Sequence, residues 1–294
     1  MDLNRSKRKI VVVLSAILFL MVLMLWQFRP PRGGSAVPVG SDPTGTRRFH
    51  TTQFPHTENP IAEGGNCKVS GGDFADVRTI PGLAFGAQNG TKKAPAKFGD
   101  STALLTGNWG PDQFVQIVVH YTGAPTESDY DEVEIRLRSA ISAKSNTGYE
   151  INCRVGRLGM WGYIQVGKVN GPVGDFTGPF DEKKGEDYSC HDGDVIVGTV
   201  TGTTLKAYLN GEQVLQATDS TFASGAPGIG FYHQGTQAQN SDFGISSAFE
   251  ADHAPANWQS GYSPARIRIQ HWVRHFRVWL EGISYRLRRR FASS

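Results

Sequence analysis

The stretch from Thr199 to Gln234 constrains the fold of this chain more than any other. Apolar and polar residues alternate over positions 204–209, the period of two that is typical of a half-buried β-strand. Asn210 and Gly211 follow, and this pair favours a hairpin because a type I′ turn needs positive φ at both central residues. A second turn at Ser224–Gly228 leads into another apolar segment. The stretch therefore predicts a strand, a hairpin turn, a second strand, a loop and a third strand.

The same stretch resembles the concanavalin A-like lectin/glucanase superfamily, and within it the laminin-G-like bacterial jelly-roll modules. Those modules carry an Asn-Gly turn, a Thr-Asp pair and then Ser-Gly-x-Pro-Gly-Ile-Gly-Phe, which occurs here at 224–231. The resemblance covers residues 59–251 and implies an all-β jelly-roll sandwich of two antiparallel sheets. The fold leaves the function open, because it serves both sugar-cleaving enzymes and binding modules.

Composition agrees with a β-sandwich. The chain has 35 Gly and 15 Pro residues among its 294 residues, as a fold with many turns requires. Strand-like segments recur with turn residues between them, at 101–105, 114–121, 132–139, 148–155, 161–169, 194–200, 205–209, 214–218, 228–233 and 242–250.

Charge is distributed unevenly along the chain. Residues 1–50 hold eight basic and two acidic side chains, and residues 264–294 hold eight Arg and one Glu. The middle, residues 51–263, has 14 basic and 24 acidic side chains. This acidic middle argues against nucleic acid as its partner, whereas the basic ends favour a membrane surface.

The N-terminus carries an apolar run of 17 residues at 10–26, preceded by four basic residues. This length just spans a bilayer, so residues 1–28 are expected to be a cytoplasmic flank and a transmembrane signal anchor. A cleaved signal peptide is the alternative; its apolar region is usually shorter. Residues 29–58 are rich in Pro, Gly, Ser and Thr and predict a disordered linker. The main domain is thus expected to be membrane-anchored and extracytoplasmic.

A second helix is predicted near the C-terminus. Residues 266–291 repeat apolar side chains at steps of three and four, and Arg residues crowd the remaining surface. Residues 252–265 are expected to link this basic amphipathic helix to the sandwich. The helix either docks on a membrane or a polyanionic envelope polymer, or it packs against the sandwich or a second copy.

Alternation also assigns the faces of the strands between Glu132 and Val169. Val133, Ile135 and Leu137 are predicted to face the core, and their neighbours to face outward. An outward face with planar polar side chains and two exposed aromatic rings is typical of sugar sites. The candidate ligand-binding residues are Glu134, Arg136, Arg138, Asn152, Arg154, Trp161, Tyr163 and Gln165. A solvated face with cross-strand Glu–Arg pairs is the alternative.

Catalytic residues are harder to assign. Retaining glucanases of the family 16 type carry Glu-x-Asp-x-Glu or Glu-x-Asp-x-x-Glu on a strand. Residues 127–132 match the longer pattern literally but lack the interleaved apolar residues of a strand. Glu132 and Glu134 share a face and are weak catalytic candidates, with Val133 where the assisting Asp would stand. Arg136 is expected to lower the pKa of Glu134, which is unfavourable for a general acid.

The three cysteines allow one disulfide. In an extracytoplasmic domain Cys153 and Cys190 are one possible pair, which would leave Cys67 free; three unpaired thiols are the alternative. No cofactor is expected except a structural calcium, which the resemblance implies in some relatives and which would use Asp242.

Together these observations predict a non-catalytic binding module for a carbohydrate or cell-envelope polymer. The alternatives are a glycoside hydrolase of the laminarinase-like class and a structural or protein-interaction module.

Overall fold

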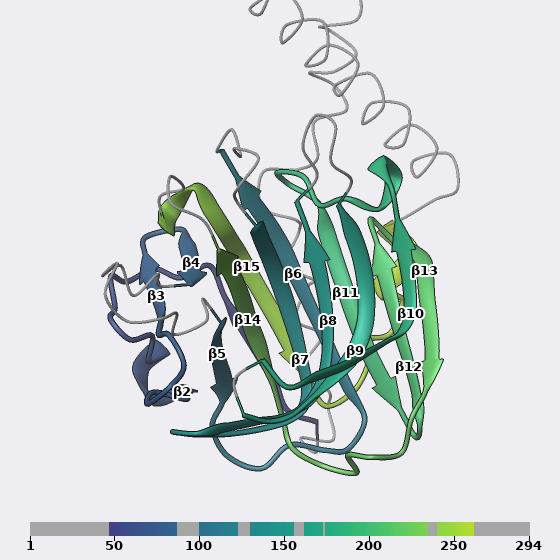
Figure 1. The fold of residues 1–294 in the computed structure, drawn as a ribbon, viewed down its shortest axis with the longest axis horizontal. Helices are drawn as coiled ribbons and strands as arrows, with labels where there is room; N and C mark the ends of the chain where they lie inside the picture. Colours follow the sequence, from purple (N-terminus) through teal and green to yellow (C-terminus); the bar gives the residue numbers. More distant parts are fainter. Residues whose placement is uncertain are drawn as a thin grey trace, which may run out of the picture. The chain divides into compact units, whose positions relative to one another are not determined.

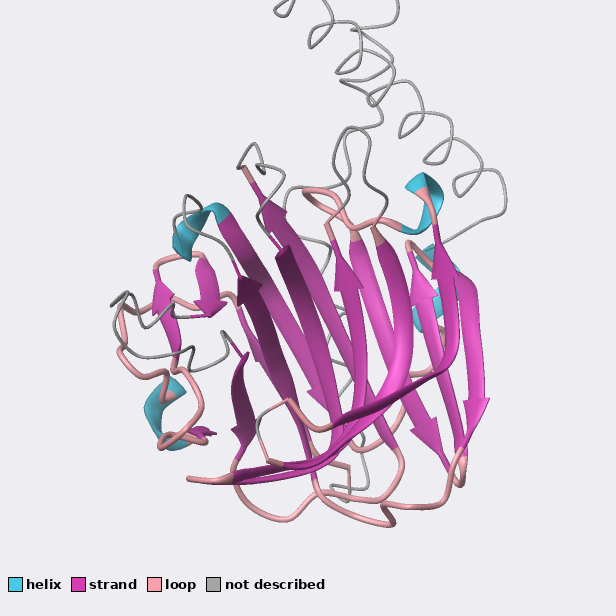
Figure 2. Cartoon of the chain, viewed as in Figure 1, coloured by secondary structure: helices cyan, strands magenta, loops and turns pink. Residues whose placement is uncertain are grey.

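A computed structural model describes residues 47–86, 100–122, 130–155, 162–172, 174–234 and 240–261. These residues form two antiparallel β-sheets with a few short 3₁₀ helices at their margins (Figures 1 and 2). The all-β architecture predicted from the sequence is thereby confirmed. The predicted anchor at 1–28 and the predicted helix at 266–291 lie outside the described residues. Within the described part of the chain, no helix is long and apolar enough to cross a membrane.

The first sheet has seven strands and the second has eight. The seven-stranded sheet runs in the order β10 (Phe176–Lys184), β9 (Tyr163–Gly171), β8 (Ser145–Arg154), β7 (Tyr130–Ser142), β14 (Ala226–Gln234), β5 (Asp100–Leu105) and β2 (Cys67–Val69). The eight-stranded sheet runs β13 (Glu212–Thr218), β12 (Thr204–Leu209), β11 (Val195–Thr201), β6 (Gln113–Tyr121), β15 (Phe243–Ala251), β4 (Leu83–Gly86) and β3 (Val77–Ile80), and β1 (Phe49–Thr52) also pairs with β15.

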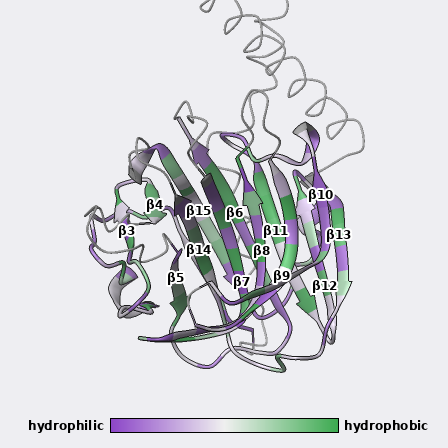
Figure 3. Ribbon diagram, viewed as in Figure 1, coloured by the Kyte–Doolittle hydropathy of each residue, from purple (hydrophilic) through white to green (hydrophobic). Residues whose placement is uncertain are grey.

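The core lies between the two sheets. Val133, Ile135 and Leu137 of β7 are fully buried there, as their alternation predicted. The sheets approach closely at Gly198 of β11, where a Cβ would lie 2.8 Å from Ile151 Cδ1 and 2.9 Å from Ile135 Cγ2. Hydrophobic and hydrophilic segments alternate along the strands (Figure 3). One side of each sheet therefore faces the core, and the other side is available for polar residues.

The predicted hairpin is confirmed. Asn210 and Gly211 have φ values of 53° and 87° and join β12 to β13, which pair antiparallel. The strand after the second turn, β14, crosses to the seven-stranded sheet and pairs with β7 and β5. The three strands of this stretch thus belong to both layers of the sandwich.

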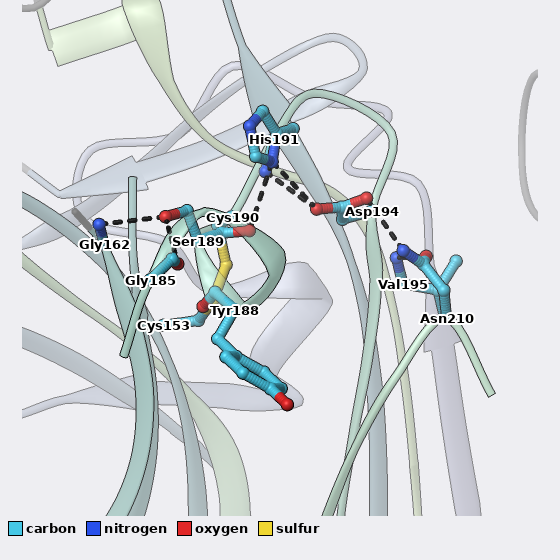
Figure 4. Close-up of a disulfide and its surroundings, with 10 residues drawn as sticks. All are labelled: Cys153, Gly162, Gly185, Tyr188, Ser189, Cys190, His191, Asp194, Val195 and Asn210. Carbon is cyan, nitrogen blue, oxygen red and sulfur yellow. Dashed lines mark hydrogen bonds and ion pairs between the residues drawn. A yellow bond between two sulfur atoms is a disulfide. The ribbon is translucent and has the colours of Figure 1, made fainter. Parts of the chain in front are cut away.

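Of the two possibilities left open for the cysteines, the structure shows the disulfide. Cys153 of β8 is bonded to Cys190, with Cα atoms 5.9 Å apart (Figure 4). The Cys190 amide donates to the Arg154 carbonyl at 3.0 Å, and Ser189 Oγ accepts from the Gly162 amide at 2.9 Å. The bond and these contacts fix the segment before β11 to the end of β8.

The sandwich extends beyond its predicted limits at both ends. Strand β1 falls in the predicted linker 29–58, yet it pairs with β15 from Phe49 to Thr52. After β15, the Asp252 amide donates to the Arg48 carbonyl at 3.1 Å, and the 3₁₀ helix η4 (Trp258–Gly261) follows. Strand β10 was not predicted, because its sequence of Gly, Pro, Asp and Lys residues lacks apolar alternation.

Candidate functional site

The outward face of the seven-stranded sheet carries most of the predicted site. Register places Gln165 of β9, Asn152 of β8 and Glu134 of β7 in one cross-strand row. In the next row Glu150 of β8 lies opposite Arg136 of β7. Residues directly opposite each other share a face, so the sheet brings these polar side chains together.

Arg136 is the centre of a buried ionic cluster on this face. Its guanidinium pairs closely with the carboxylates of Glu134 and Glu150 and lies 3.2 Å from Asp100 Oδ1. Asn152 Nδ2 donates to Glu150 Oε1 at 2.7 Å. Only 1% of Arg136 and 2% of Glu134 is exposed. The ionic cluster, defined as Asp100, Glu134, Arg136, Glu150 and Asn152, is therefore shielded from water.

A glycine makes room for this cluster. Gly230 of β14 lies opposite Glu134 in the sheet. A Cβ at this position would collide with Glu134 Oε2 and lie 2.8 Å from Arg136 Nε. The two side chains thus lie across β14 where it has no side chain of its own.

The protonation of the ionic cluster differs from the prediction. Burial raises the pKa of Glu134 well above its usual 4.5, and the Arg136 guanidinium only partly opposes this. Burial also raises the pKa values of Glu150 and Asp100. Arg136 lowers the pKa of Glu134 as expected, but the loss of water around the carboxyl outweighs this effect, so the expected net lowering was wrong. The Glu134 carboxyl can therefore keep its proton at a pH at which an exposed glutamate has already ionised.

Tyr163 and Glu132 form a second polar contact on the same face. The Tyr163 hydroxyl donates a close hydrogen bond to Glu132 Oε1, and the Arg154 guanidinium lies 6.0 Å from the Tyr163 ring centroid. Tyr163 is only 9% exposed, so the prediction of an exposed ring was wrong. Gln165 is likewise 9% exposed, and Trp161 lies outside the described residues. Tyr163 therefore presents no exposed ring on this face against which a sugar could stack.

Arg138 does not share the outward face with Glu134 and Arg136, although its spacing in β7 predicts this. The pairing of β7 with β8 shifts between Leu137 and Ala140, and Arg138 has a φ of 47°. Its guanidinium donates to the carbonyls of Pro111, Phe222 and Gly202 at 2.6, 3.0 and 2.7 Å. Arg138 therefore holds three loops together at the end of the sandwich and is apart from the ionic cluster.

The predicted calcium residue, Asp242, lies in the 3₁₀ helix η3 (Asn240–Asp242), and its carbonyl accepts from the Thr122 amide at 2.9 Å. No group of three or more His, Cys, Asp or Glu side chains among the described residues could hold a metal ion. The structural calcium therefore stays a prediction without a described ligand set.

A pocket lies on the opposite side of the sandwich, on the outward face of the eight-stranded sheet. Its volume is about 380 Å³. It lies between the start of β6, the strands β11 and β12, and the segment that follows β15. We call it the outer pocket, and its lining consists of Asp112, Gln113, Thr199, Thr201, Thr204, Lys206, Tyr208, His253, Ala254 and Trp258.

Aromatic contacts build one wall of the outer pocket. The Trp258 ring meets Tyr208 edge to face with centroids 4.8 Å apart, and meets Phe114 at 5.2 Å. Phe114 in turn contacts Phe249 at 6.0 Å. Trp258 keeps part of its surface exposed, whereas Phe114 is fully buried. This second, smaller apolar cluster fixes Trp258 at the edge of the outer pocket.

Polar groups make up the rest of its lining. Thr199 of β11 lies opposite Lys206 of β12, and Thr201 lies opposite Thr204. The hydroxyls of these three threonines and the Lys206 ammonium make no hydrogen bond to any residue in the described ranges. Gln113 is occupied, because its amide donates to the carbonyls of Gly110 and Gly225.

Sequence reasoning missed the outer pocket. The alternation of β12 sets Lys206 and Tyr208 on the outward face, but it does not distinguish a pocket from a wet surface. Trp258 lies in the segment predicted to be a linker, and no periodicity there signals a contact with the sandwich.

No protein-family model matches the chain, and no curated protein matches it significantly. Solved structures do. The carbohydrate-binding module CBM66 from Bacillus subtilis is 17% identical at a TM-score of 0.42, over 57% of this chain and 92% of that one. The Emp46p carbohydrate recognition domain in its potassium-bound form is 12% identical at a TM-score of 0.45, over 69% and 96%. The β-porphyranase BpGH16B from Bacteroides plebeius is 9% identical at a TM-score of 0.36, over 70% and 92%.

The likeness is one of fold.

Proposed function

We propose that this protein is a non-catalytic module that binds a carbohydrate or a cell-envelope polymer. The observation that supports it is the outer pocket, in which an aromatic wall stands beside hydroxyls and an ammonium that have no hydrogen-bond partner among the described residues. Its volume of about 380 Å³ falls within the range of roughly 300–1,000 Å³ that is usual for ligand sites.

The chemistry of the lining suits a sugar. Sugar hydroxyls both donate and accept hydrogen bonds, and the hydroxyls of Thr199, Thr201 and Thr204 can do the same. The C–H groups of a sugar ring pack against an aromatic surface, which Trp258 provides at the edge of the outer pocket. A ligand without hydroxyls would leave these polar groups unpaired, at a cost of about 1–3 kcal/mol for each one that it buries.

The proposed location is extracytoplasmic, with residues 1–28 as the membrane anchor. The Cys153–Cys190 disulfide supports this, because disulfides persist mainly in oxidising compartments. The basic residues before the apolar run at 10–26 favour an orientation with the sandwich outside.

A glycan array probed with the purified full chain in mild detergent tests the proposal. Thr199→Val removes a hydroxyl from the outer pocket with little change of volume, and Thr51→Val makes the same change at an exposed position of β1. We expect Thr199→Val to weaken binding of every bound glycan about five- to tenfold, while Thr51→Val binds like the wild type. An array without any bound glycan would overturn the proposed function, and equal binding by Thr199→Val and wild type would overturn the outer pocket as its site.

A glycoside hydrolase is the second candidate, and one observation favours it. Glu134 and Glu150 contact the same guanidinium, and the raised pKa of Glu134 suits a general acid. Release of reducing ends from β-glucans by the wild type, lost in Glu134→Gln, would establish this function. It would also exclude a purely binding role.

A further inference from the structure

The outer pocket has an uneven charge. Apart from the phenol of Tyr208, three ionisable side chains line it: the carboxylate of Asp112, the imidazole of His253 and the ammonium of Lys206. The electrostatic potential at a bound ligand depends on which of these charges are already balanced by neighbouring groups of the protein.

The Asp112 carboxylate is compensated. Its Oδ1 accepts from the Gly202 amide at 2.9 Å and lies 3.7 Å from the Arg138 guanidinium. Asp112 is also half exposed, so water screens what remains of its charge. This carboxylate therefore adds little negative potential to the outer pocket.

His253 is engaged as well. Its Nδ1 lies 2.8 Å from Oδ1 of the neighbouring Asp252, whose Oδ2 accepts from the Arg48 amide at 3.0 Å. The imidazole thus has a carboxylate partner inside the protein, and a ligand would have to compete with Asp252 for it.

Lys206 differs from both. Within the described ranges no carboxylate pairs with its ammonium. It is partly buried in the middle of β12, where Thr199 of β11 lies directly opposite on the same face. An ammonium and a hydroxyl that stand side by side can both donate to one oxygen anion.

The geometry points to an anionic saccharide as the ligand of the outer pocket, bound with its acidic group at Lys206 and Thr199 and its ring beside Trp258. The acidic group is a uronic carboxylate, a sulfate or a phosphate, which share the charge and the acceptor oxygens that this pair of donors recognises. The inference rests on the proposed glycan-binding function and names its ligand class.

The test uses the full chain in mild detergent and an array on which every acidic glycan stands beside its neutral counterpart. The pairs are uronic oligosaccharides with their methyl esters, and sulfated or phosphorylated oligosaccharides with their unmodified parents. We expect the acidic member to bind at least tenfold more tightly than its neutral counterpart. This preference should decrease as the salt concentration rises, because salt screens the charge interaction. Which kind of pair shows the preference identifies the acidic group.

Two variants assign the preference to the outer pocket. Lys206→Gln should lower the affinity for the acidic member about tenfold more than the affinity for the neutral member, so that the preference between the two members is lost. Lys68→Gln, which changes an exposed lysine of β2 away from the outer pocket, should behave as wild type. Equal binding of both members, or an acidic preference that survives in Lys206→Gln, would overturn the inference while glycan binding stands. An array on which no glycan binds would remove the proposed function as well.

Discussion

Trp258 meets Tyr208 edge to face with ring centroids 4.8 Å apart, and this contact fastens the segment after the last strand to β12. Phe114 of β6 completes the arrangement at 5.2 Å from Trp258. The segment that follows β15 therefore belongs to the folded sandwich. Its attachment also forms a wall of the outer pocket, so one indole ring links the stability of the sandwich to the proposed ligand binding.

Replacement of the Trp258 ring should lower the stability of the sandwich. Trp258→Ala removes a partly buried aromatic side chain, and we expect the free energy of unfolding to fall by about 1–3 kcal/mol. Denaturant titration followed by circular dichroism measures the change. Trp258→Phe keeps one ring against Phe114 and should recover at least half of the loss. An alanine variant as stable as the wild type would show that the ring adds nothing to the sandwich.

The disulfide should contribute more than any single contact. Cys153 and Cys190 are separated by 37 residues, and closing a loop of this length stabilises a protein by about 4 kcal/mol in the chain-entropy description. The double variant Cys153→Ala/Cys190→Ala should therefore unfold at a clearly lower denaturant concentration.

Cys67→Ala is the matched control for the disulfide variant, because it removes a thiol and no disulfide. It should cost much less than the double variant. The wild type in reducing agent should approach the stability of the double variant, and no response to reducing agent would contradict the prediction.

Period-two alternation explains why much of the fold could be predicted. Val133 and Glu134 are neighbours in sequence and point to opposite faces of β7, and this follows from strand geometry alone. The Asn210-Gly211 turn is equally local, because its backbone requirement is met by those two residues. Such features need no knowledge of the rest of the chain.

What could not be predicted depends on distant contacts. Alternation gives the direction of Tyr163 but not what covers it, and so its burial was missed. Arg138 lies within the register shift between Leu137 and Ala140, and no feature of the local sequence indicates this shift. Trp258 packs on Phe114 and Tyr208, which lie far away along the chain, so the outer pocket becomes visible only in the folded molecule.

Gly230 tests the packing of the ionic cluster. A methyl group there would collide with Glu134 and crowd Arg136, whose side chains lie across β14. We expect Gly230→Ala to lower the free energy of unfolding by roughly 1–3 kcal/mol, as overpacking usually does. Gly110→Ala is the control, since its nearest heavy atom, Asp252 Cβ, would be 3.2 Å away. Equal effects of the two substitutions in a thermal melt would argue against tight packing at Gly230.

The ionic cluster should also make stability depend on pH. Burial raises the pKa of Glu134 well above its usual 4.5, and the pKa values of Glu150 and Asp100 shift in the same direction. A carboxyl with a raised pKa binds its proton more tightly in the folded than in the unfolded state. The stability that this proton provides is complete below the unfolded pKa, and it is lost as the pH rises through the folded pKa. The free energy of unfolding of the wild type should therefore decrease as the pH rises from 4.5, the usual pKa of the Glu carboxyl, toward the raised pKa of the folded protein.

Glu134→Gln isolates the contribution of one carboxyl, because the amide cannot ionise and still offers an oxygen to Arg136. Its free energy of unfolding should decrease less over the same range of pH, so that the variant gains on the wild type as the solution becomes more basic. The raised pKa values of Glu150 and Glu250 remain in the variant and keep part of the slope. Glu212→Gln, at an exposed position of β13, should leave the wild-type slope unchanged. Parallel curves for Glu134→Gln and the wild type would mean that Glu134 ionises in the folded protein as it does in the unfolded chain.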